Sequence, residues 1–96
     1  MFHIDPNNYP LERLICRRNK FSYKLPVRTR AGRTLKLLCE FQTHSDLVFN
    51  APQDTFANNE TIQVRITTLR GFDWVTCVLT YVEEHPQHCL YQFSLI

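Results

Sequence analysis

Alternation of apolar and polar residues with a period of two dominates the chain from residue 21 onward. Successive side chains of a β-strand point to opposite faces, so this period predicts strands with one buried face. The pattern runs through Phe21 to Arg28, Thr34 to Gln42, Thr61 to Leu69, Trp74 to Val82 and Cys89 to Leu95. The apolar run from Leu47 to Phe49 predicts one more, shorter strand.

Turn-forming residues separate these segments. Gly32 lies where the chain is expected to reverse, since glycine tolerates positive φ, and residues 24–42 therefore form a predicted β-hairpin. Pro26 cannot donate a ladder hydrogen bond, which places the first strand at an edge or a bulge. About six strands with hairpin-like connections and no long helix predict an all-β fold, a small six-stranded antiparallel barrel over residues 21–96.

The same alternation predicts which side chains fill the barrel. One apolar face consists of Leu35, Leu37, Cys39 and Phe41, and another of Val75, Cys77, Leu79 and Tyr81. Phe56 is a buried candidate in the polar loop from Gln53 to Glu60. The four cysteines, Cys16, Cys39, Cys77 and Cys89, include no C-x-x-C pair, so we expect reduced core thiols rather than a disulfide framework.

Residues 1–20 differ from the rest and form a predicted N-terminal basic segment. Pro10 to Arg17 favours a short helix, with proline in the first turn and with Leu11, Leu14 and Ile15 as its buried stripe. The alternative is an extended segment. Two helical turns are marginal alone, so such a helix needs tertiary contacts.

Composition and charge narrow the protein class. An apolar fraction of 44% with 12% aromatic residues indicates a globular protein, and no apolar run approaches the roughly 18 residues of a membrane span. We therefore expect a cytoplasmic protein without membrane insertion. Nine of the eleven basic residues lie between Arg13 and Lys36, which favours an anionic partner for that third of the chain.

Features of an enzyme or a metal centre are weak. His85, His88 and Cys89 have the right ligand types, but no second cluster completes a tetrahedral site, and a solvent-exposed turn is the simpler interpretation. Ser45 beside His44 and Asp46 resembles a triad only in letters, because neighbouring residues on a strand diverge. We expect no catalytic residues, no metal and no cofactor.

The order of features resembles a PilZ domain, the small six-stranded barrel of bacterial cyclic di-GMP signalling. That family opens with an R-x-x-x-R segment, continues into a strand of the type seen from Phe21 to Arg28, and then shows a D/N-x-S-x-x-G turn. Arg13 and Arg17 match the first motif literally, and Arg17 or Arg18 precedes the strand. The resemblance spans residues 17–96.

Carried over residue by residue, the resemblance gives an incomplete ligand site. Its candidate residues are Arg13, Arg17, Arg18, Thr43, Ser45 and Val48. Thr43 stands where the family has Asp or Asn, and Val48 stands where it has glycine, so a β-branched side chain occupies a position of close ligand approach. The helix that usually follows the family's last strand is also missing from residues 1–96.

The resemblance therefore implies a regulatory adaptor that acts mainly through protein–protein interaction, with a partner protein or a second copy of the chain. Two alternatives remain. The first is a genuine cyclic di-GMP receptor that uses the N-terminal arginines and Ser45. The second is a nucleic-acid-binding barrel that uses Arg28, Arg30 and Arg33. Nucleic acid is the least favoured of these partners.

Overall fold

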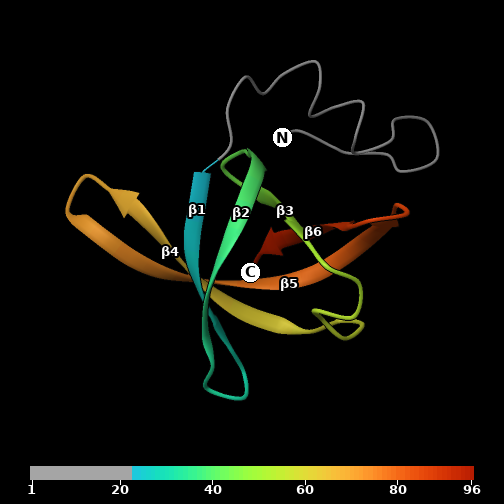
Figure 1. Cartoon of the computed structure of the whole chain (residues 1–96). Coiled ribbons are helices and arrows are strands. Elements are labelled where there is room, and N and C mark those ends of the chain that lie inside the picture. Colours follow the sequence, from blue (N-terminus) through green and yellow to red (C-terminus); the bar gives the residue numbers. More distant parts are fainter. Residues whose placement is uncertain (1–22) are drawn as a thin grey trace.

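The computed structural model describes residues 23–96, which form a closed antiparallel barrel (Figure 1). Its strands are β1 (Tyr23–Thr29), β2 (Thr34–Gln42), β3 (Asp46–Ala51), β4 (Thr61–Thr68), β5 (Gly71–Glu84) and β6 (Cys89–Leu95). Around the barrel they follow the order β1-β2-β3-β6-β5-β4. The predicted six-stranded barrel is confirmed, whereas the predicted N-terminal helix lies outside the described residues. Within residues 23–96 there is no helix long and apolar enough to cross a membrane.

Two tight hairpin turns depend on glycines with positive φ. Gly32 has φ 87° in the β1–β2 turn, where the Thr29 N–H donates to the Arg33 carbonyl at 2.8 Å. Gly71 has φ 116° at the start of β5, opposite Thr68. Other residues are strained at such angles, so these positions fix both reversals.

The core is a cluster of aromatic and aliphatic side chains inside the barrel. Phe93 is fully buried at its centre, with its ring edge-to-face with Phe56 and Phe49 at centroid distances of 4.9 and 6.0 Å. Phe56 comes from the β3–β4 loop. Its side chain is buried, which confirms the prediction. The Tyr91 hydroxyl donates to the Pro52 carbonyl at 2.7 Å and ties that loop to β6.

Two β-bulges change the predicted inward faces. In β2 the register shifts between Cys39 and Phe41, so Phe41 pairs with Val48 and lies outside the core cluster. In β5 the register shifts between Leu79 and Tyr81, so Val82, instead of Tyr81, packs against the core. The expectation that Phe41 and Tyr81 continue their strands' core faces is wrong, because each bulge inserts a residue and reverses the alternation.

The cysteines within the described residues are free and buried, as the sequence predicts. They are Cys39, Cys77 and Cys89, while Cys16 lies outside the described residues. Burial raises the pKa of the Cys39 and Cys77 thiols to about 11, since desolvation disfavours the thiolate. These cysteines therefore act as small apolar core residues.

Candidate functional site

The turn between β2 and β3 contains the predicted site residues Thr43 and Ser45. The Thr43 hydroxyl oxygen accepts the backbone N–H groups of Ser45 and Asp46 at 3.3 and 3.0 Å. The Ser45 hydroxyl donates to Asp46 Oδ2 at 3.0 Å. Both side chains are therefore engaged in holding the turn and in stabilising the adjacent carboxylate.

Asp46 is the centre of this polar cluster and is buried, with 7% of its surface exposed. Two residues of β6 complete its surroundings: Ser94 Oγ donates to Asp46 Oδ1 at 2.7 Å, and Gln92 Nε2 does so at 3.4 Å. The Ser94 hydroxyl also lies 3.4 Å from the Thr80 hydroxyl on β5. The cluster thus connects three neighbouring strands on the outer side of the barrel wall.

The structure brings only part of the predicted ligand site together. Val48 follows Asp46 on the same side of β3 and is fully buried opposite Gln92, so it presents no open surface. Arg13, Arg17 and Arg18 lie outside the described residues. Sequence reasoning was wrong to separate Ser45 from Asp46, because Ser45 belongs to the turn, where adjacent side chains can meet. The third residue of that letter triad, His44, is exposed.

Two arginines of the described barrel lie over aromatic rings, Arg28 near the β1–β2 turn and Arg65 on β4. The Arg28 guanidinium carbon lies 4.1 Å from the centre of the Trp74 ring, and that of Arg65 lies 4.7 Å from the centre of Phe72. A hollow of about 480 Å³ between this turn and β4 includes Arg28 and Arg30 in its lining. Stacked cations of this kind stabilise the surface by cation–π attraction.

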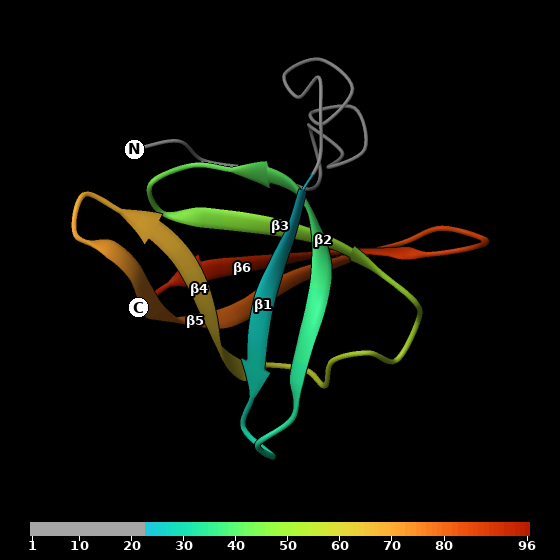
Figure 2. The same cartoon turned by 60° about the vertical axis from the view of Figure 1, so that its left-hand side comes forward.

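A seam opens where β1 and β4 separate. Their pairing covers only Val27–Thr29 of β1 with Ile62–Val64 of β4. β4 continues to Thr68 along β5, whereas the first half of β1 continues along β2, and the two strands diverge (Figure 2). The described part of the barrel is therefore closed at one end of this seam and open at the other.

Pro26 explains where the seam opens. The Thr29–Arg33 hydrogen bond shows that the odd-numbered residues of β1 bond to β2, because antiparallel ladders alternate. The backbone of Pro26 consequently faces β4, and proline has no N–H to donate to that strand. The next hydrogen-bonded pair after Arg28 with Gln63 would join Pro26 to Arg65, and the seam opens at this position.

The same alternation identifies the groups that face the seam from β4. The Leu79 N–H donates to the Glu60 carbonyl at 2.9 Å, which continues the register of β4 with β5. Every second residue from Glu60 therefore bonds to β5, and the residues between them face the other way. Arg65 and Thr67 thus direct their backbone N–H and carbonyl groups into the open seam.

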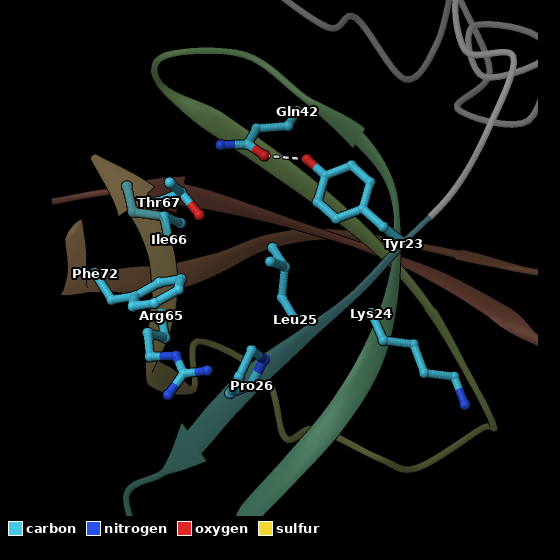
Figure 3. A pocket seen from close by; sticks show the side chains of 9 residues that line it. All are labelled: Tyr23, Lys24, Leu25, Pro26, Gln42, Arg65, Ile66, Thr67 and Phe72. Atoms are coloured by element: carbon cyan, nitrogen blue, oxygen red, sulfur yellow. Dashed lines mark hydrogen bonds between the residues drawn. The ribbon is translucent and has the colours of Figure 1, made fainter. Parts of the chain in front are cut away.

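A cavity of about 370 Å³ occupies the open seam (Figure 3). Leu25 points into it, Phe72 and Arg65 lie on the β4 and β5 side, and Lys24 points away. At its rim the Tyr23 hydroxyl donates to Gln42 Oε1. Partial burial raises the pKa of Tyr23 to about 12, which keeps this donor protonated.

Sequence reasoning missed most residues of both regions. Proline inside a strand pattern was the usable signal for the seam: β1 pairs with both of its neighbours, but its pairing with β4 ends before Pro26. Gln92 and Ser94 gave no signal, because their proximity to Asp46 depends on the pairing of β3 with β6, which are far apart in the sequence. Comparison of the chain with protein-family models, curated proteins and solved structures gave no match.

Proposed function

We propose that this chain is a PilZ-like regulatory adaptor of bacterial cyclic di-GMP signalling that acts by binding a partner protein. The observation that carries this proposal is a group of exposed apolar side chains around the open seam. Phe72 is 66% exposed and Tyr23 is 43% exposed, and both line the cavity, while the fully exposed Leu69 lies in the adjoining β4–β5 turn. Exposed apolar groups that gather around a cavity are typical of a protein-binding surface.

The geometry of the predicted ligand site favours an adaptor over a cyclic di-GMP receptor. The hydroxyls of Thr43 and Ser45 are occupied by hydrogen bonds within the cluster around Asp46. Val48 is fully buried at the position where the family has glycine. A receptor at this site would have to exchange these internal hydrogen bonds for contacts with the ligand, which costs binding energy.

Two measurements on the full chain test the proposal. Calorimetric titration with cyclic di-GMP is expected to give no heat up to high micromolar concentration. In parallel, the immobilised chain is used to isolate a binding protein, whose affinity is then measured with purified components. A Phe72→Ser variant is expected to weaken this binding at least tenfold, because it removes apolar contact area at the cavity.

Ile96→Ser is the matched control, since Ile96 is also an exposed apolar residue, 80% exposed, but does not line the cavity. It is expected to bind the partner like the unmodified chain. Tight cyclic di-GMP binding that depends on Arg13 or Arg17 would replace the adaptor with a receptor. Binding of an oligonucleotide that weakens steeply with salt would instead favour the basic surface around Arg28.

A further inference from the structure

We propose that the partner protein supplies an extended peptide segment, which adds as a strand to the edge of β4 in the open seam, where residues 23–96 provide no pairing strand. This inference rests on the proposed adaptor function and identifies the binding site and the class of partner. Arg65 and Thr67 direct their N–H and carbonyl groups into the seam beyond the point where β1 pairs with β4. An extended peptide can satisfy these groups by continuing the ladder that β1 begins.

The edge of β4 is a better template than the facing edge of β1. Natural sheets protect free edges with proline and lysine, and the seam edge of β1 contains both, Pro26 and Lys24. The open end of β4 contains Ile66, Thr67 and Thr68, which are β-branched residues that favour strand pairing. The peptide is therefore expected to pair with β4 and to pack against β1 only through side chains.

The side chains around the seam define the chemistry of the peptide. Alternate residues of an added strand point into the cavity, toward Leu25 and Ile66, which favours apolar side chains there. The residues between them point outward, beside Arg65. Within residues 23–96, Arg65 forms no ion pair with a carboxylate, and the nearby Asp73, opposite Ile66 on β5, does not line the cavity. An acidic residue in this outward position would satisfy its guanidinium.

The first test uses three synthetic peptides with the full chain. A fluorescein-labelled peptide of six residues, in which valine and glutamate alternate, is expected to bind and to shift the amide NMR signals of Arg65 and Thr67. The same peptide with N-methyl groups on the amides of its glutamates, which face β4, is expected to bind at least tenfold more weakly, because it cannot form the ladder. A peptide in which valine and lysine alternate is also expected to bind at least tenfold more weakly, because its lysines repel Arg65. Equal binding of the N-methylated peptide would overturn strand addition.

The second test closes the seam without removing any contact side chain of β4. Pro26→Val supplies the N–H that β1 lacks opposite Arg65, so the ladder can extend and the peptide is expected to lose at least tenfold in affinity. Arg65→Glu is expected to weaken the valine–glutamate peptide and to strengthen the valine–lysine peptide. Arg70→Glu is the matched control, since Arg70 is exposed in the β4–β5 turn outside the cavity, and it should leave both affinities nearly unchanged.

Other outcomes separate this inference from the adaptor function on which it rests. If a purified partner binds Pro26→Val as tightly as the unmodified chain, the adaptor function stands and the seam is not its site. If the Arg65 and Thr67 signals shift with protein concentration alone, the edge of β4 pairs with a second copy of the chain, and the partner peptide is ruled out. If neither protein nor peptide binds, both proposals fail.

Discussion

Replacement of Asp46 tests whether the polar cluster on the barrel wall stabilises the fold. Its carboxylate accepts short hydrogen bonds from Ser94 at 2.7 Å and Ser45 at 3.0 Å, and a longer one from Gln92 at 3.4 Å. A hydrogen bond to a charged group contributes about 1.5–3 kcal/mol. Asp46→Ala removes all three bonds, but Ser94 and Ser45 keep the hydroxyls of Thr80 and Thr43 nearby, at 3.4 and 3.5 Å.

We therefore expect Asp46→Ala to lower the free energy of unfolding by about 2–4 kcal/mol, a large part of the total for a domain of this size. Asp46→Asn is the control, because it keeps one acceptor for Ser94 while Ser45 can turn to accept, and we expect a loss of about 1–2 kcal/mol. Urea unfolding followed by the fluorescence of Trp74, the single tryptophan, measures both variants.

A double-mutant cycle with Ser94→Ala adds the direct test of the short hydrogen bond, and a coupling of about 0.5–3 kcal/mol is expected. An Asp46→Ala variant that is as stable as the unmodified protein, or more stable, would show that the cluster does not stabilise the fold. That result would mean that the buried carboxylate is retained at the expense of stability, as functional groups often are.

Two further predictions concern the barrel interior. Phe93→Ala is expected to lower the free energy of unfolding by about 3–5 kcal/mol, because it opens a cavity between Phe49 and Phe56. Phe72→Ala on the surface should change it by no more than about 0.5 kcal/mol. Equal effects of the two variants in urea unfolding would contradict the assigned core. Cys39 and Cys77, whose pKa is raised from 9.0 to about 11, should resist iodoacetamide at pH 8.5 in the folded protein and react in urea, as mapped by mass spectrometry; rapid labelling of the native protein would contradict their burial. Their protonated form is favoured by folding, so the stabilising contribution is complete below pH 9 and is lost as the pH rises toward 11.

The Asp46 cluster and the seam differ in how far sequence reasoning could reach them. Pro26 signalled an edge by itself, since the missing N–H is a local property. The neighbours that turn this edge into a cavity, Arg65 and Phe72, come from a hairpin about 40 residues later in the chain. No local pattern reports which strand lies across a seam, because barrel closure depends on pairing between distant strands.

The sequence alone predicts the six strands, the hairpin turn at Gly32 and most of the core, because alternation and turn chemistry act between residues close in the chain. Tertiary structure alone decided the side on which Phe41 and Tyr81 lie, since each follows a bulge that no local pattern marks. It also decided that the Ser45 hydroxyl donates to Asp46 and that, among residues 23–96, the end of β4 beyond Val64 has no partner on its β1 side. The unpaired end of β4 follows from the register between distant strands, which is set when the whole barrel packs.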